Sequence, residues 1–262
     1  MMRLLRAEGS KLATVRSTWW LLAGILVTML GVAAAVTLSV DLPRCGPDTT
    51  CMEDTPRLSL FGTRLAQVLI VILAAAAICG EYESRMAMTT FSATPKRLRV
   101  YAAKATVLTA ATAVVGAFAV AGTLLMARLT LPYHGYTAAR GYPLLSAADG
   151  DLQRAAGGTV LYLCLVGLMS LGIGASTRSH AATISTVLGL LFLFPLAGAF
   201  VTAPRWQDRL HKWGPMDAGL AIQNTLHPVP GPIHPWHGLG VLALWALAAL
   251  IAGALTVRFR DA

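Results

Sequence analysis

Two cysteines and three histidines are the residues outside the apolar runs whose types best suit chemistry. Cys45 and Cys51 stand five residues apart in a polar stretch. Three readings remain open for them: a disulfide, free thiols, or use as metal ligands or catalytic groups. A disulfide here would close a short loop and stabilise the fold by about 2 kcal/mol at most.

His227, His234 and His237 cluster in a proline-rich segment. A zinc site usually needs four ligands on a rigid frame, and this segment offers fewer. We therefore expect an irregular surface segment here. We predict no catalytic residue, no metal and no cofactor bound by this chain.

The chain also lacks an ATP-binding motif. A P-loop requires a Gly-Lys-Ser/Thr sequence. None of the lysines follows a glycine; they are Lys11, Lys96, Lys104 and Lys212. Any function driven by ATP must therefore use an ATPase on another chain, and ATP and Mg²⁺ are expected to bind there.

The composition predicts an all-α polytopic membrane protein with a single domain over residues 1–262. Of the 262 residues, 56% are hydrophobic and 13% are charged, whereas about 25% are charged in soluble domains. A helix needs about 20 apolar residues to cross the hydrocarbon core. Six such transmembrane helices are predicted, at residues 19–40, 58–80, 105–127, 155–175, 181–201 and 238–257.

The basic residues predict which side of the membrane holds the N- and C-termini. The N-terminal segment, the second and fourth connections and the C-terminal tail hold 12 of the 21 basic residues and four of the 12 acidic residues. The other side holds the remaining nine basic and eight acidic residues. By the positive-inside rule, the termini are cytoplasmic. Membrane topology thus accounts for the net charge of +9. The sequence contains no basic–aromatic stripe of the kind that binds nucleic acid, so no nucleic-acid partner is expected.

Three long connections are expected on the outer side, at residues 41–57, 131–154 and 202–237. The last contains Trp206, Trp213 and Trp236. Tryptophans are typical of the interface between membrane and water.

Small residues form a stripe along the third predicted span and a shorter one along the fourth. The third carries Ala105, Thr109, Thr112, Gly116, Ala119 and Thr123, and the fourth carries Cys164, Gly167, Ser170 and Gly174. The opposite side of the third span is expected to carry Val107, Leu108, Val114, Val115 and Phe118. Small faces let helices approach closely in lipid. The stripes can serve helix packing, a substrate path, or both at a subunit interface.

Charged residues and histidines are absent from the centres of the predicted spans. Proton- and ion-coupled transporters usually keep such residues there. Their absence disfavours a secondary transporter and an intramembrane metalloprotease.

Two segments are expected to form structure at the cytoplasmic surface. Residues 1–18 have the composition of an interfacial helix, in which Glu8 and Lys11 are spaced to pair; the alternative is a solvated flank. Residues 81–104 form a charged connection that Pro95 divides. A simple loop between spans could be shorter, so docking to a soluble partner is one reading.

Three stretches of the sequence resemble the ABC-2-type permease family, the membrane subunits of ABC transporters, in its actinobacterial form. The first runs from Arg6 to Trp20. The second and most specific comprises Gly80, Glu81 and Tyr82, then Thr89 to Arg97, then Ala103 and Lys104. The third runs from Leu152 to Ala182. The resemblance covers nearly the whole chain in order and spacing.

The resemblance implies a six-span subunit in the bacterial plasma membrane that pairs with a second membrane subunit and two separate ATPase subunits. The implied ATPase-coupling residues are Arg6, Glu8, Lys11, Glu81, Tyr82, Arg85, Thr89, Pro95, Lys96 and Arg97. Family members often have glycine where this chain has Arg85. The expected cargo is an exported amphiphilic drug, peptide or lipid-like molecule. The alternatives are a non-transporting membrane anchor or immunity protein, a membrane enzyme, or a secondary transporter.

Overall fold

The computed structural model describes residues 2–39, 54–83, 97–134, 149–201, 203–225 and 233–259. Of these residues, 94% are helical and none lies in a strand, so the prediction of an all-α fold is confirmed. Six helical segments are long and apolar enough to cross a membrane, which suggests a membrane protein. They are α2 (Arg16–Ser39), Pro56–Gly80 within the run of α3 (Thr55–Ser59), η1 (Leu60–Gly62) and α4 (Thr63–Glu83), α6 (Arg97–Thr130), α7 (Gly150–Thr177), α8 (His180–Phe200) and α11 (Pro235–Phe259).

Each of these six segments overlaps one predicted span, and several of them extend past its predicted ends. The clearest case is α6, which begins at Arg97. Residues 97–104 were predicted to belong to the connection between spans, whereas they form the first turns of α6. The reason is that backbone hydrogen bonding propagates a helix beyond the limits of its apolar residues.

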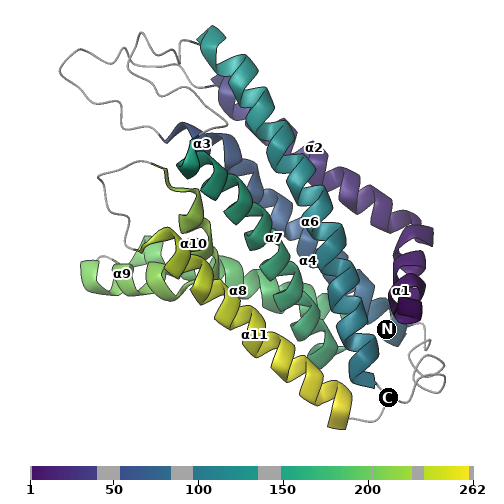
Figure 1. The fold of residues 1–262 in the computed structure, drawn as a ribbon. Coiled ribbons are helices and arrows are strands. Elements are labelled where there is room, and N and C mark those ends of the chain that lie inside the picture. Colours follow the sequence, from purple (N-terminus) through teal and green to yellow (C-terminus); the bar gives the residue numbers. More distant parts are fainter. Residues whose placement is uncertain are drawn as a thin grey trace.

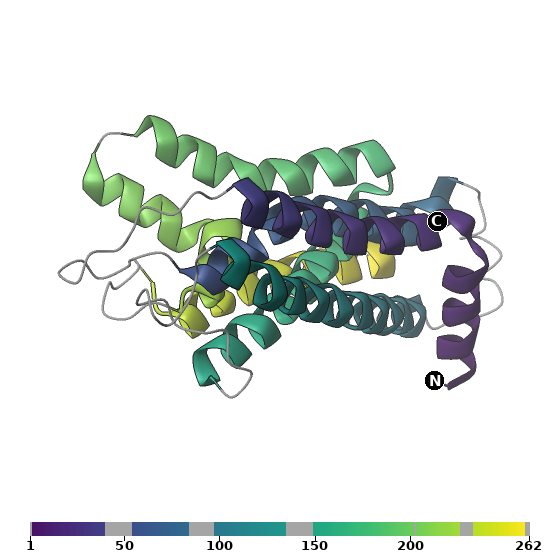
Figure 2. The ribbon, with the colours of Figure 1, turned by 90° about the horizontal axis from the view of Figure 1, so that it is seen from above.

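Helix α1 (Met2–Thr14) crosses the end of the bundle, whereas the six long segments run along it (Figures 1 and 2). The chain leaves the helical conformation at Val15 and begins α2 at Arg16. The Trp19 indole N–H donates a hydrogen bond to the Ala13 carbonyl at 2.9 Å, which satisfies an acceptor in the last turn of α1. The start of α1 and the end of α11 lie at the same end of the bundle, here called the terminal end (Figure 1).

Helix α7 lies at the centre of the bundle and contacts α4, α6, α8 and α11. Its side chains Leu163, Val166 and Met169 are fully buried in the main apolar cluster. Its backbone comes close to that of α11 at Gly172. A Cβ added there would lie 2.4 Å from the Ala249 carbonyl carbon, so only glycine fits without a shift of the backbone.

The connection between α8 and α11 is more ordered than the sequence predicted. It contains helix α9 (Pro204–Trp213), helix α10 (Pro215–Leu220) and the short 3₁₀ helix η4 (Ala221–Gln223). No residue of α9 is buried, whereas most of α10 is buried against α8 and α11. These helices lie at the opposite end of the bundle from α1 (Figure 2).

Amide and hydroxyl side chains attach this connection to the bundle. Gln223 donates from Nε2 to the hydroxyls of Thr63 and Thr159, at 3.2 and 3.1 Å. Gln67 accepts a hydrogen bond from the Tyr162 hydroxyl and donates to the sulfur of Met216 in α10 at 3.3 Å. Buried polar groups in lipid need such internal partners.

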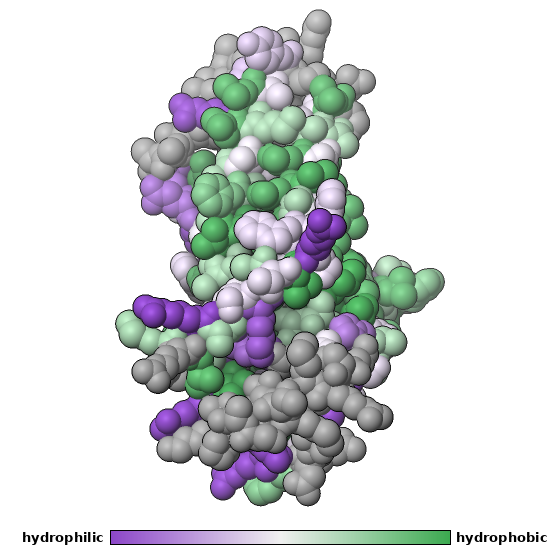
Figure 3. All heavy atoms as spheres, turned by 90° about the vertical axis from the view of Figure 1, so that its right-hand side faces the viewer, coloured by the Kyte–Doolittle hydropathy of each residue, from purple (hydrophilic) through white to green (hydrophobic). Residues whose placement is uncertain are grey.

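Apolar residues make up most of the middle of the face drawn in Figure 3. Large apolar side chains such as Val27 of α2 and Val114 and Phe118 of α6 are exposed. A band of exposed apolar residues suits contact with lipid hydrocarbon.

We predict that Gly172→Ala destabilises the protein by about 2 kcal/mol or more, because the added methyl group forces α7 and α11 apart. Gly157→Ala is the matched control on the same helix, since nothing lies within 4 Å of its added Cβ. It should change stability by less than about 1 kcal/mol. Apparent melting temperatures in one detergent measure both changes. Equal temperatures for the two variants would contradict the close α7–α11 contact.

Candidate functional site

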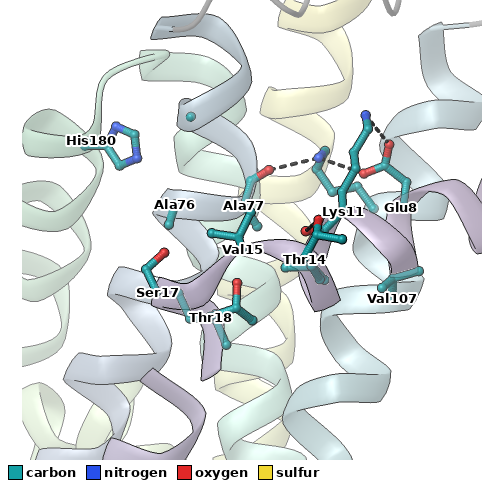
Figure 4. A pocket seen from close by; sticks show the side chains of 14 residues that line it. Glu8, Lys11, Thr14, Val15, Ser17, Thr18, Ala76, Ala77, Val107 and His180 are labelled. Atoms are coloured by element: carbon teal, nitrogen blue, oxygen red, sulfur yellow. Dashed lines mark hydrogen bonds and ion pairs between the residues drawn. The ribbon is translucent and has the colours of Figure 1, made fainter. Parts of the chain in front are cut away.

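A buried ion pair joins α1 to the bundle at the terminal end. The Lys104 ammonium in α6 lies 2.8 Å from Glu8 Oε2 and also donates to the Ala77 carbonyl of α4 at 2.9 Å. Lys11 donates to Glu8 Oε1 at 3.0 Å, so the predicted spacing of Glu8 and Lys11 does produce a pair. Figure 4 shows Glu8, Lys11 and Ala77 in this arrangement. One carboxylate thus links α1, α6 and, through Lys104, α4.

Burial strengthens the attraction within this ion pair and makes the loss of either partner costly. Glu8 is 4% exposed and Lys104 is 6% exposed. Burial raises the pKa of Glu8, but the positive charges and hydrogen bonds of Lys104 and Lys11 outweigh it and hold the pKa below its ordinary value of 4.5. Glu8 is therefore ionised at neutral pH. The ionised Glu8 carboxylate stabilises the folded protein at pH values above its ordinary pKa. This stabilisation is lost only as the pH falls through the lowered pKa of the folded protein.

A cavity of about 460 Å³ lies beside the ion pair. Its lining comes from α1, the start of α2, α4, α6 and the first residue of α8, His180. Figure 4 places His180 away from Glu8 and Lys11, with Ser17, Thr18, Ala76 and Ala77 also around the cavity. Apart from Glu8, Lys11, Lys104, His180 and three hydroxyl groups, the lining is apolar. Such a lining can hold an apolar group.

The structure places some of the predicted coupling residues at this site. Glu8 and Lys11 form it, while Arg6 is exposed on α1 and Arg97 is half-buried at the start of α6. Glu81 and Tyr82 belong to the last turn of α4, although their side chains lie outside the described part. Four further coupling residues lie outside the described residues altogether: Arg85, Thr89, Pro95 and Lys96.

Sequence reasoning did not assign a role to Lys104. It was counted among the basic residues of the connection, whereas it is the buried partner of Glu8. A signal was available, because a lone lysine at the edge of an apolar helix needs a partner in the protein or must reach the headgroups. The identity of the partner was not available, since Glu8 is 96 residues away in the chain.

The predicted stripes of small residues lie between α6, α7 and α4. A Cβ added at Gly167 would lie 3.7 Å from the Thr112 hydroxyl, and one at Gly116 would lie 3.4 Å from Leu163. One added at Gly174 would lie 2.4 Å from Ile78. Ser170 is buried and donates to the carbonyl one turn earlier, and Thr109 is half-buried and does the same.

The division of α6 into two faces was partly wrong. Val114 and Phe118 are exposed, whereas Thr112 of the stripe is buried, but Leu108 and Val115 are buried with Thr112. In a helix, residues three and four positions apart share a face, and the predicted division separated such neighbours.

Only two of the cysteines and histidines considered above for chemistry lie within the described residues. Cys45, Cys51 and His227 lie outside it. His234 and His237 are both exposed, with ring centroids 5.3 Å apart. In the described part of the chain, no three His, Cys, Asp or Glu side chains are grouped so that they could hold a metal ion.

No protein-family model matches this sequence, and no curated protein matches it either. The resemblance to ABC-2-type permeases therefore stays a prediction. The observations that bear on function are the six membrane-compatible segments and the attachment of α1 to α6 and α4.

We predict that Glu8→Gln or Lys104→Met alone destabilises the protein by about 3 kcal/mol, because each leaves the other polar group buried with fewer partners. The double variant should recover most of that loss, since neither charge then remains. Apparent melting temperatures of the four proteins in one detergent give the coupling between the two residues.

Lys11→Ala is the control for this cycle. Its side chain is 42% exposed, so its loss should cost less than about 1 kcal/mol. Additive effects of Glu8→Gln and Lys104→Met would show that the two side chains do not interact.

Proposed function

We propose that this chain is the membrane-spanning subunit of an ABC exporter whose ATPase is a separate chain. The observation that carries the proposal is the buried ion pair that fastens α1 to α6 and α4. It provides a route by which force applied at the terminal end reaches the long helices. The resemblance of residues 80–97 to ABC-2-type permeases supports the same reading.

The arrangement of the terminal end suits docking of a partner. Helix α4 finishes there at Glu83, α6 begins there at Arg97, and α1 crosses the same end (Figure 1). A soluble protein bound at this end can therefore contact α1 and the ends of two long helices together. Arg6 and Arg97 supply positive charge at this surface, and the exposed Arg6 points to an acidic partner surface.

The mechanism follows from these links. ATP binding draws two ATPase subunits together, and their movement displaces α1 and the segment between α4 and α6. Because Lys104 holds both Glu8 and the Ala77 carbonyl, α6 and α4 move with α1. The interface with a second membrane subunit then rearranges, which gives alternating access to an amphiphilic drug, peptide or lipid-like cargo. ATP and Mg²⁺ bind to the partner, and this chain performs no covalent chemistry.

We also propose that the terminal end is cytoplasmic, that α1 lies at the inner surface, and that the protein resides in a bacterial plasma membrane. The excess of basic residues at this end supports that orientation. The exposed tryptophans of α9 and α11 then lie at the outer surface.

The first test is a pull-down of the tagged full-length protein from a mild detergent. We expect an ATPase subunit in stoichiometric amount. A folded, monodisperse sample that brings down no ATPase would contradict the permease reading and favour a membrane anchor.

We predict that Glu81→Ala combined with Arg97→Ala lowers ATPase recovery at least fivefold, since each surface ion pair contributes up to about 1 kcal/mol. The matched control is Arg205→Ala with Asp208→Ala on α9, which removes the same two charges at the opposite end. The control should recover as much ATPase as the parent protein. Unchanged recovery with the first pair, in a sample whose melting temperature is also unchanged, would refute this docking surface.

Reporter fusions test the orientation. Alkaline phosphatase needs its disulfides, which form only outside the cytoplasm. We expect activity when it is fused after Asp208 and none when it is fused after Ala262. Activity at Ala262 alone would reverse the proposed orientation.

A further inference from the structure

A second cavity, of about 360 Å³, lies at the opposite end of the bundle from the ion pair. It is enclosed by α3, the start of α4, α9, α10 and η4, and by Ile233. Its volume falls in the range of small-ligand pockets, about 300–1,000 Å³. Its polar lining consists of Arg57, Arg64, His211, Asp217, Gln223 and Asn224.

The cavity carries an excess of positive charge. Within the described residues, no ion pair joins the guanidinium of Arg57 or Arg64 to a carboxylate. Asp217 is the acidic residue of the lining, and its Oδ2 lies 2.8 Å from Nδ1 of His211. Two arginines therefore face the cavity without a counterion from the described part of the chain.

The carboxylate of Asp54, which caps the start of α3, already has hydrogen-bond partners. Asp54 accepts hydrogen bonds from the Thr225 backbone N–H at 2.6 Å and from its hydroxyl at 2.7 Å. It also accepts from the backbone N–H of Arg57 at 3.2 Å, which fixes the first turn of α3. These bonds engage the Asp54 carboxylate with Thr225 and with the backbone of α3.

Two residues of the cavity lining, Gln223 and Arg64, are held in place by other side chains of the protein. Gln223 is 4% exposed and is fixed by Thr63 and Thr159. The Arg64 guanidinium lies over the Phe61 ring, 4.9 Å from its centroid, which limits its freedom. A site whose groups are already positioned loses less entropy on binding.

The depth of the cavity indicates where its ligand comes from. Helix α9, which supplies His211, also exposes Trp206 and Trp213, which are 59% and 65% accessible. Trp236 at the start of α11 is 50% accessible. Exposed tryptophans mark the headgroup level of a bilayer. A site beside these tryptophans suits contact between its arginines and lipid phosphates.

We propose that this cavity binds a phosphate group through Arg57 and Arg64, and that the phosphate belongs to the headgroup of an anionic lipid. Guanidinium groups form paired hydrogen bonds with phosphate oxygens, which makes arginine a preferred phosphate ligand. The site does not depend on an ATPase partner, so it stands or falls separately from the proposed function.

The test uses the full-length protein in a mild detergent and native mass spectrometry with added lipid. The probes are dioleoyl phosphatidylglycerol, which is anionic, and dioleoyl phosphatidylcholine, which has the same phosphate but no net charge. We expect the parent protein to retain phosphatidylglycerol at least tenfold more strongly than the variant Arg57→Gln/Arg64→Gln, since hydrogen bonds to charged groups contribute about tenfold each. Phosphatidylcholine should show a much smaller difference.

Arg128→Gln is the matched control. Arg128 is an exposed arginine in the last turn of α6, and it does not line the cavity. It should retain phosphatidylglycerol as the parent does. An equal loss in Arg128→Gln and in the double variant would mean a general effect of surface charge and would overturn the proposal.

Inorganic phosphate shows whether the cavity binds the phosphate of a lipid headgroup or a free phosphate. If the cavity serves lipid headgroups, millimolar phosphate should neither raise the melting temperature of the parent protein nor displace phosphatidylglycerol. Protection by phosphate that the double variant loses would support the phosphate site but replace the lipid by a free phosphate ester. Equal retention of phosphatidylglycerol by the parent and a double variant of normal melting temperature, without phosphate protection, would overturn the site.

Discussion

Hydrocarbon offers no hydrogen bonds, and this constraint governs the whole structure. Every peptide group at membrane depth must find its partner within the chain, which leaves helices as the available structure for these segments. The same constraint applies to buried side chains. Gln67 and Tyr162 pair with one another, and Gln223 pairs with two threonine hydroxyls. The partners of these buried amides and this hydroxyl therefore fix how α4, α7 and the α8–α11 connection fit together.

The two ends of the bundle meet this constraint in different ways. At the terminal end, a charged pair between Glu8 and Lys104 connects a crossing helix to the long helices. At the opposite end, neutral amides attach α10 and η4 to α4 and α7. A charged pair is costly to separate when buried, so it holds α1 firmly against α6. The amide contacts hold α10 and η4 over the opposite end. Beside them lies a cavity lined by two arginines that have no carboxylate partner among the described residues.

Close helix packing supplies the rest of the cohesion. The α7–α11 contact at Gly172 brings two backbones together, and Gly167 and Gly174 bring α7 close to α6 and α4. Helix association in lipid depends on such contacts, because apolar side chains gain little by leaving one apolar environment for another. Helix α7 is accordingly the most buried of the long segments, while α2, α8 and α11 leave most of their surface open to lipid or to another subunit.

The sequence by itself determined the helical class, the six membrane-compatible segments and the Glu8–Lys11 pair, because each depends on local composition or spacing. It also pointed to Glu8 and Lys11 as residues of a site, but not to Lys104, whose partner comes from 96 residues away. Only the tertiary structure decided that α10 is buried, that Leu108 and Val115 face the core, and that Arg57 and Arg64 share a cavity. The physical reason is that lipid and protein interior are both apolar, so hydrophobicity shows that a helix crosses a membrane but not which of its faces meets another helix.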